Sequence, residues 1–234
     1  MSRRFASPIG ATVPLSPVTD VLGIFVKAPE SGKVKTRLAV AIGADGAADL
    51  YRRMAHGIIS RSVAPDRYRS AVWFSPATGE AIVQDWLGDL PIDDFVPQPD
   101  VGLGTRLLAA FERHRAGGAT RVIVIGSDSP ELNVALVAEA FEALDRDDVV
   151  LGPARDGGFY LLGLRVLVPT LFQDVEWSTP GVFHQVMTNA TSLHLRISVL
   201  RELRDVDTVA DALSFGLLTP LEVFDQESPG AGQA

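Results

Sequence analysis

The chain has 234 residues, of which 47% are hydrophobic and 21% charged, and its formal net charge at pH 7 is −8. This length favours one large domain over two, and the apolar content is sufficient for a sizeable core. The sequence contains no cysteine, which excludes disulfides, thiolate nucleophiles and cysteine-ligated zinc. The negative charge argues against a nucleic-acid partner, and no apolar run approaches the length of a membrane span. We therefore expect a cytoplasmic protein.

The two ends of the chain differ in composition from the rest. Residues 1–19 are rich in proline, serine and alanine, and residues 226–234 are mostly small or polar. The sequence predicts a flexible N-terminal arm and a flexible tail over these two ranges. Residues 20–225 contain no internal repeat and no linker-like stretch, so they are predicted to form a single domain.

Strand-like and helix-like segments alternate along this domain. In chain order the pattern predicts a strand at Val21–Val26, a helix at Thr36–Val63 with a break near Gly43–Gly46, a strand at Ser70–Phe74, a helix at Glu80–Leu87, a strand at Asp94–Val96 and a helix at Thr105–Arg115. It then predicts a strand at Arg121–Ile125, a helix at Val134–Leu144 capped by Asn133, strands at Val149–Leu151, Phe159–Leu164 and Leu193–Leu200, and a helix at Thr208–Leu213. This order predicts a mostly parallel sheet covered by helices on both faces, with an irregular subregion between residues 159 and 200.

A basic loop joins the first strand to the first helix. Its residues are Lys27-Ala28-Pro29-Glu30-Ser31-Gly32-Lys33-Val34-Lys35-Thr36-Arg37, with four cations and one acid in an acidic protein. Lysine charges, the free N–H groups of a helix start and a glycine that lets the backbone approach are typical of a pyrophosphate site. The glycine spacing matches neither a Walker loop nor the dinucleotide-binding fingerprint. The alternative is a solvated surface loop that happens to be basic.

A carboxylate follows the most strand-like segment, in the run Gly126-Ser127-Asp128. Asp128 is expected at the carboxyl end of its strand, where open α/β sheets bind ligands. A single carboxylate there suits Mg²⁺, which takes one or two protein carboxylates together with phosphate oxygens. The alternative is that Asp128 only opens the turn before the next helix.

Two more acidic turns have both a structural and a functional interpretation. The run Asp156-Gly157-Gly158 is, on its own, best explained as a hairpin turn, and the functional alternative places Asp156 in the cleft as a base or metal partner. In Asp205-Val206-Asp207-Thr208, either Asp207 or Thr208 is expected to cap the last helix. The alternative is that one of these carboxylates completes the metal site.

Taken in order, these motifs resemble one bacterial family. The segments that carry the resemblance are Lys27–Leu38, Gly126–Leu132, Gly152–Tyr160, Glu176–Thr179 and Asp205–Thr208, together with Gln98–Arg106. The family is that of the glycosyltransferase-like proteins known as arsenosugar-biosynthesis or selenodomain-associated transferases. The resemblance covers about residues 21 to 215, which is nearly all of the predicted domain.

The resemblance implies a three-layer α/β/α, Rossmann-like GT-A fold, that of the nucleotide-diphospho-sugar transferases, with a mostly parallel mixed sheet. The same fold serves nucleotidyltransferases such as the molybdenum-cofactor and phospholactate guanylyltransferases. This chain departs from the glycosyltransferase pattern, because the usual Asp-x-Asp metal motif is here Gly126-Ser127-Asp128 and its first acid is missing. The second metal ligand is then expected to be Asp156 or Asp207.

The implied function is a Mg²⁺- or Mn²⁺-dependent glycosyltransferase that uses a nucleotide-diphosphate sugar and a small-molecule acceptor. The expected nucleotide-binding residues are Lys27, Ala28, Pro29, Gly32, Lys33, Lys35, Thr36, Arg37, Gly104 and Ser127. The expected metal ligands are Asp128 and Asp207, and the expected catalytic residues are Asp156 as base with Lys35 and Arg37 on the leaving group. The expected substrate-binding residues are Gly157, Gly158, Trp177, Ser178 and Thr179. The alternatives are a nucleotidyltransferase that releases pyrophosphate from a nucleoside triphosphate, and a non-catalytic nucleotide-binding protein of the same fold.

Overall fold

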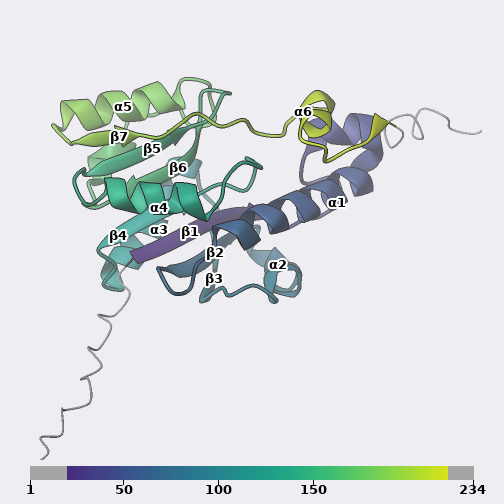
Figure 1. The fold of residues 1–234 in the computed structure, drawn as a ribbon, viewed down its shortest axis with the longest axis horizontal. Coiled ribbons are helices and arrows are strands. Elements are labelled where there is room, and N and C mark those ends of the chain that lie inside the picture. The colour runs from purple at the N-terminus through teal and green to yellow at the C-terminus, as the bar shows by residue number, and fades with distance from the viewer. Residues whose placement is uncertain (1–19, 221–234) are drawn as a thin grey trace, which may run out of the picture.

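The computed structural model describes residues 20–220 (Figure 1). The predicted arm at residues 1–19 and the predicted tail at residues 226–234 lie outside the described residues. Among the described residues, no helix combines the length and the apolar character that crossing a lipid bilayer requires.

Seven strands form one mixed sheet in the order β3-β2-β1-β4-β6-β5-β7. The strands are β1 (Asp20–Lys27), β2 (Arg69–Ser75), β3 (Asp94–Pro97), β4 (Arg121–Ile125), β5 (Val149–Pro153), β6 (Phe159–Leu164) and β7 (Ile197–Val199). Only β6 runs antiparallel to its two neighbours, β4 and β5, and the other pairs are parallel. The predicted mostly parallel α/β fold is confirmed.

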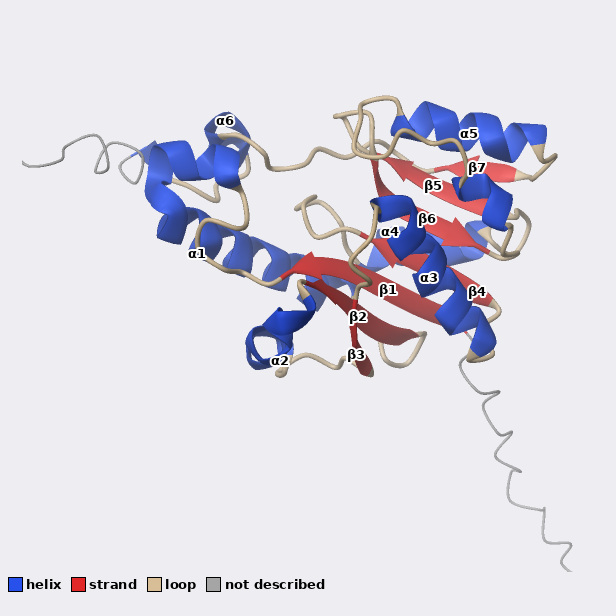
Figure 2. Ribbon diagram, turned by 180° about the vertical axis from the view of Figure 1, so that it is seen from behind, coloured by secondary structure: helices blue, strands red, loops and turns tan. Residues whose placement is uncertain are grey.

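Helices cover both faces of this sheet, as Figure 2 shows. The helices are α1 (Thr36–Ser62), α2 (Glu80–Leu87), α3 (Leu103–Ala116), α4 (Val134–Ala143), α5 (Val182–Ser192) and α6 (Val209–Ser214), with short 3₁₀ turns η1 (Ala77–Gly79) and η2 (Pro169–Phe172). Successive strand residues point to opposite faces, so in β4 Ile123 belongs to the apolar layer that includes residues of α1, α2, α4 and α6, while Val124 belongs to the layer that includes residues of α3, α5 and η2. The core therefore consists of two apolar layers, one on each face.

Helix α1 is broken where the sequence predicts. Gly43 has φ 74° and ψ 162°, a conformation outside the helical region that glycine adopts without a steric penalty. The caps of two other helices are also as expected. Asn133 accepts hydrogen bonds from the N–H groups of Ala135 and Leu136, and Thr208 forms a capping box with Asp211.

The region between residues 159 and 200 differs from the prediction. It contains helix α5, which buries Val182, Val186 and Ala190 on one face, and the sequence analysis assigned no helix there. The predicted strand Leu193–Leu200 is only Ile197–Val199, because Leu193 ends α5 and His194 turns the chain with φ 55°. The segment whose polar and apolar residues alternate thus consists of a helix end, a turn and a three-residue strand.

A partly buried histidine on α3, His114, makes the free energy of unfolding of this fold depend on pH. The indole N–H of Trp73 donates to Nε2 of His114 at 3.0 Å. Burial, reinforced by the positive charge of Arg113, lowers the pKa of His114 from 6.5 to about 4. The unfolded chain binds this proton near pH 6.5, so the free energy of unfolding should fall as the pH drops from about 6.5 to about 4, by at most about 1.4 kcal/mol per pH unit. Urea titrations across this range would measure the slope, and His114→Gln should flatten it; an unchanged slope in the variant would contradict this account.

Candidate functional site

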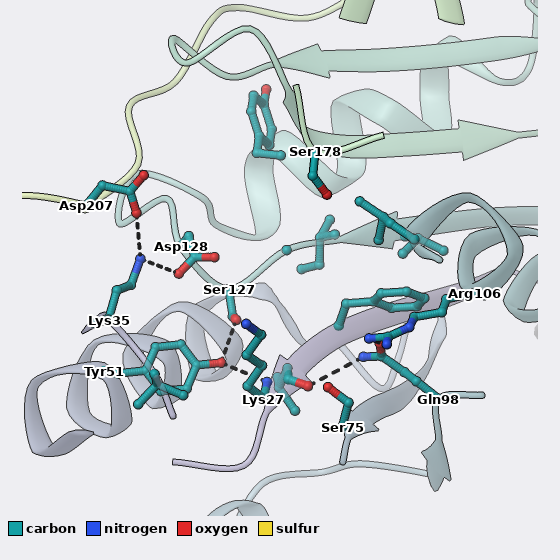
Figure 3. Close-up of a pocket in the computed structure, with 18 of the residues that line it drawn as sticks. Lys27, Lys35, Tyr51, Ser75, Gln98, Arg106, Ser127, Asp128, Ser178 and Asp207 are labelled. Atoms are coloured by element: carbon teal, nitrogen blue, oxygen red, sulfur yellow. Dashed lines mark hydrogen bonds and ion pairs between the residues drawn. The ribbon is translucent and has the colours of Figure 1, made fainter. Parts of the chain in front are cut away.

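The main cavity opens at the carboxyl ends of β1 and β4 and has a volume of about 530 Å³ (Figure 3). The chain leaves β1 toward β2 and β3 on one side and returns to β4 on the other, so the strand order reverses between these two strands. Ligands of open α/β sheets bind at such a reversal. The cavity is lined from the β1–α1 loop, the β4–α4 turn, the start of α3, the start of β6 and the segment before α6.

The basic loop turns the start of α1 toward this cavity. Lys35 precedes the helix in a left-handed conformation with φ 45°, and Lys35, Thr36 and Arg37 line the cavity together with Lys27. The remaining loop positions predicted to bind nucleotide do not line it; they are Ala28, Pro29, Gly32 and Lys33. Of these, Lys33 is exposed to solvent and Gly32 supplies a positive φ of 73°. The loop therefore contributes three of its four cations and a helix N-terminus to the cavity wall, and Lys33 is the exception.

Lys35 joins the two predicted metal ligands. Its Nζ lies 2.6 Å from Oδ1 of Asp128 and 3.3 Å from Oδ1 of Asp207. Its side chain is 7% exposed, whereas those of Asp128 and Asp207 are 47% and 43% exposed. Burial alone would lower the pKa of Lys35, but the charges and hydrogen bonds of the two carboxylates outweigh it and raise this pKa above the usual value. Lys35 is therefore a fixed positive charge at the bottom of the cavity.

The segment that contains Asp207 is held against the turn after β4 by a backbone hydrogen bond as well as by Lys35. The N–H of Val206 donates to the carbonyl of Asp128 at 3.1 Å. Arg37 Nη1 adds a weaker ion pair with Oδ2 of Asp207 at 3.7 Å. Because Thr208 caps α6, the carboxylate of Asp207 is available to the cavity.

Asp205 and Tyr51 were not among the predicted site residues, although Asp205 is one of the two carboxylates that the sequence offered for the metal site. The Ser129 hydroxyl donates to Asp205, whose pKa rises to about 6 because the carboxyl is buried and because Asp128 and Asp156 add negative charge. Asp205 belongs to the same acidic motif as Asp207, so the motif itself was the available signal. Tyr51, from the middle of α1, had no such signal.

Tyr51 ties the ends of β1 and β4 together. Its buried hydroxyl accepts the N–H of Lys27 at 3.0 Å and shares a hydrogen bond of 3.0 Å with the Ser127 hydroxyl. Ser127 is the middle residue of the Gly126-Ser127-Asp128 motif, whose missing first acid is replaced by Gly126, and Ser127 is almost completely buried. It lines the cavity and anchors the turn that presents Asp128, and its role in nucleotide binding stays a prediction.

Asp156 lies in the hairpin that joins β5 to β6, as the structural interpretation predicts. Its Oδ1 accepts the N–H of Gly158 at 2.9 Å, and Asp156 is not among the residues that line the cavity. Gly157 has φ 91°, and a Cβ there would lie 2.0 Å from the carbonyl oxygen of Pro180. Packing against that backbone is sufficient to explain Gly157. The catalytic role of Asp156 stays a prediction.

The predicted substrate-binding segment forms one wall of the site. Ser178, with φ 65°, lines the cavity, whereas Trp177 and Thr179 do not. Trp177 instead borders an adjacent hollow of about 240 Å³, where a Cβ on Gly104 would lie 2.2 Å from the indole nitrogen. Gly104 is thus explained by its contact with Trp177, and it does not line the main cavity.

The donor set at the cavity fits a hard divalent cation. The carboxylates of Asp128 and Asp207 converge on the ammonium of Lys35, so a divalent cation would share these oxygens in competition with it, and further ligands would come from a bound phosphate and water. Within residues 20–220 no group of three or more histidine, aspartate or glutamate side chains could hold a metal ion by itself. The residues therefore suit an ion that is held jointly by the protein and a substrate.

A protein-family profile matches the middle of the chain. The profile described as "Uncharacterized protein conserved in bacteria (DUF2064)" matches residues 58–179, just over half of the sequence. The chain belongs to this family. No curated protein matches this member of the DUF2064 family.

Solved structures show the same fold. A protein from Desulfovibrio desulfuricans G20, named as a candidate nucleotide-diphospho-sugar transferase, is 33% identical with a TM-score of 0.77, over 83% of this chain and 86% of that one. CMP:2-keto-3-deoxy-manno-octonic acid synthetase, solved with CTP, is 14% identical with a TM-score of 0.53, over 90% and 100% of the two chains. The 4-diphosphocytidyl-2C-methyl-D-erythritol synthase from Anaerococcus prevotii DSM 20548 is 12% identical with a TM-score of 0.52, over 83% and 95%. The last two similarities concern the fold alone. The predicted nucleotide-diphospho-sugar transferase fold is confirmed.

Proposed function

We propose that this DUF2064 protein is a transferase that binds a nucleotide-diphosphate sugar with Mg²⁺ or Mn²⁺ and transfers the sugar to a small-molecule acceptor. The observation that supports this best is the convergence of Lys35, Asp128 and Asp207 beside the N-terminus of α1. The 33% identical protein named as a candidate nucleotide-diphospho-sugar transferase supports the same class of reaction. The finer resemblance to arsenosugar-biosynthesis transferases stays a prediction about the acceptor.

In this proposal the diphosphate lies at the start of α1. Free N–H groups at the helix start and the charges of Lys35 and Arg37 stabilise the negative charge that develops on the leaving nucleoside diphosphate. Asp128 and Asp207 hold the divalent cation, which supplies Lewis-acid stabilisation to the same phosphates. Three of the four loop cations line the cavity, and two of them, Lys35 and Arg37, lie at this helix start, so positive charge is concentrated where the leaving group forms.

The bond changes of glycosyl transfer follow from this placement. The acceptor oxygen attacks the anomeric carbon, the bond from that carbon to the β-phosphate oxygen breaks, and the acceptor proton passes to a base. We propose Asp156 as this base, because its hairpin leads directly into Phe159 and Tyr160 at the start of β6, which line the cavity. Ser178 then lies on the acceptor side of the cavity.

Nucleotidyl transfer is a second candidate, and the absence of a carboxylate at Gly126 favours it. The first acid of Asp-x-Asp is replaced by Gly126, and the middle residue Ser127 anchors the turn to Tyr51. The cavity is consequently richer in cations than in carboxylates near α1. Such a site also suits attack on an α-phosphorus with pyrophosphate as the leaving group, and the shared fold with a CTP-bound synthetase is compatible with it.

One experiment separates the two reactions. The purified protein would be incubated with Mn²⁺ and, in parallel, with nucleotide-diphosphate sugars plus an acceptor panel or with nucleoside triphosphates plus sugar 1-phosphates. Acceptor-dependent release of nucleoside diphosphate is the expected result. Pyrophosphate release from a triphosphate would contradict glycosyl transfer and assign the second candidate. If neither product forms and no nucleotide shifts the melting temperature, both candidates fail.

A further inference from the structure

The side of the cavity away from Lys35 carries a second polar group. Gln98 follows β3 and Arg106 lies near the start of α3, and both line the cavity. Figure 3 places them on the opposite side from Lys35, Asp128 and Asp207. The proposed phosphate chemistry uses neither residue.

Gln98 is held in one orientation. Its side chain is buried, and its Nε2 donates to the carbonyl oxygens of Trp73 at 2.7 Å and Val26 at 3.4 Å. Two carbonyl partners require donors, so the amide nitrogen must face them. The amide oxygen is left for Arg106, whose Nη1 donates to it at 3.3 Å. Gln98 therefore positions the guanidinium of Arg106.

Hydrogen bonds hold the side chain of Arg106 in place but do not use all of its N–H donors. Its Nε donates to the carbonyl of Val101 at 2.6 Å, and its Nη2 lies 3.9 Å from the fully exposed carboxylate of Asp100. Of the five guanidinium N–H groups, two thus have a hydrogen-bond acceptor among the described residues. The side chain is only 25% exposed. A rigid, partly buried guanidinium with unused donors at a cavity is suited to bind a planar group that presents two acceptors.

Apart from Gln98 and the exposed Asp100, the surroundings of this guanidinium are mostly apolar. Phe25 is the register partner of Trp73, whose carbonyl holds Gln98, and the ring of Phe25 lines the cavity. Leu103 and Leu107 line it from the same helix as Arg106, and Leu103 is exposed although it is large and hydrophobic. A flat ring with a polar edge matches such surroundings, whereas a phosphate or a free sugar does not.

We propose that Arg106, positioned by Gln98, selects the base of the bound nucleotide and prefers guanine or cytosine; this rests on the proposed nucleotide function. A guanidinium fork needs two adjacent acceptors, which guanine offers as O6 and N7 and cytosine as O2 and N3. Adenine places an amino group beside its ring acceptors, and in uracil the ring nitrogen between the two carbonyls carries a hydrogen. Neither base offers the fork an adjacent acceptor pair.

Equilibrium binding of GDP, CDP, ADP and UDP, each with Mn²⁺, would test this selection, with inorganic pyrophosphate as a probe of the phosphate side alone. We expect GDP or CDP to bind at least about tenfold more tightly than ADP and UDP. The ranking of GDP against CDP identifies the base. Equal affinity for all four nucleotides, or a preference for ADP or UDP, would overturn the inference and leave the phosphate site standing. No binding of any nucleotide or of pyrophosphate would overturn the proposed function as well.

Arg106→Lys keeps the positive charge and removes the fork. The substitution should reduce the preference for the favoured base to less than about threefold, mainly by weakening the binding of the favoured nucleotide. It should leave the affinity for pyrophosphate unchanged. Arg113→Lys is the matched control, because Arg113 lies on the same helix, pairs with the exposed Asp94 and does not line the cavity. Arg106→Gln is a second variant for the case that the lysine variant is unstable. An undiminished preference in a folded Arg106 variant would overturn the inference.

Discussion

Replacing Asp128 by asparagine should remove the dependence of nucleotide binding on the divalent cation. Asparagine keeps the size and the turn-forming ability of aspartate but loses the charge that a hard cation requires. We expect the gain in nucleotide affinity produced by Mn²⁺ to fall by about 10–100-fold, which corresponds to about 1.4–2.7 kcal/mol. The measurement is the melting-temperature shift and the dissociation constant for each nucleoside diphosphate with and without Mn²⁺.

The matched control for this experiment is Asp66→Asn. Asp66 lies in the exposed turn before β2 and does not line the cavity, so its loss changes the net charge by the same amount. It should leave the effect of Mn²⁺ unchanged. If Asp128→Asn binds nucleotide and Mn²⁺ as the natural chain does, Asp128 serves only as a turn residue and the metal proposal fails.

Replacing Lys35 by methionine should change the affinities for phosphate and for metal in opposite directions. Lys35 supplies the buried positive charge of the phosphate site, so nucleotide and pyrophosphate binding should weaken by about 10–100-fold. Its ammonium also occupies the point between Asp128 and Asp207, where it competes with a cation. Binding of Mn²⁺ in the absence of nucleotide should therefore become tighter in the variant, and isothermal titration calorimetry measures both affinities.

Lys33→Met provides the comparison within the same loop. Lys33 is exposed and does not line the cavity, so its loss should change nucleotide affinity by less than about threefold. Equal losses for the two lysine variants would mean that the loop acts through its total charge rather than through one placed ammonium. A Lys35→Met protein with weakened Mn²⁺ binding would contradict the competition between lysine and metal.

Local patterns in the sequence predicted the parts of the site that depend on strand ends. Asp128 comes directly after a strand of strongly apolar residues. Because parallel strands bring their carboxyl ends to one edge of the sheet, this short segment is enough to predict where Asp128 lies. The break of α1 at Gly43 and the cap at Asn133 were predictable for the same reason, because each depends on the conformation of one residue type.

The features that were missed depend on contacts between distant segments. The choice of Lys35 over Lys33 follows from a left-handed turn at Lys35 and from burial against Asp128, which no charge pattern along the loop reveals. Tyr51 is one of several apolar residues on α1 until its hydroxyl is seen to join two strand ends. Arg106 is one of several basic residues on α3, and only the fixed amide of Gln98 distinguishes it.

The ion pair between Lys35 and Asp207 joins residues that lie 172 positions apart in the sequence. During synthesis, the phosphate loop and β1 to β6 all leave the ribosome before Asp207 does. A chain that stops short of this residue retains Lys35 and Asp128 but has only one of the two carboxylates. All seven strands of the sheet precede that point, so a chain can fold its sheet before it has both carboxylates of the proposed metal site. The complete site can therefore form only late in synthesis, after the chain has been made through residue 207.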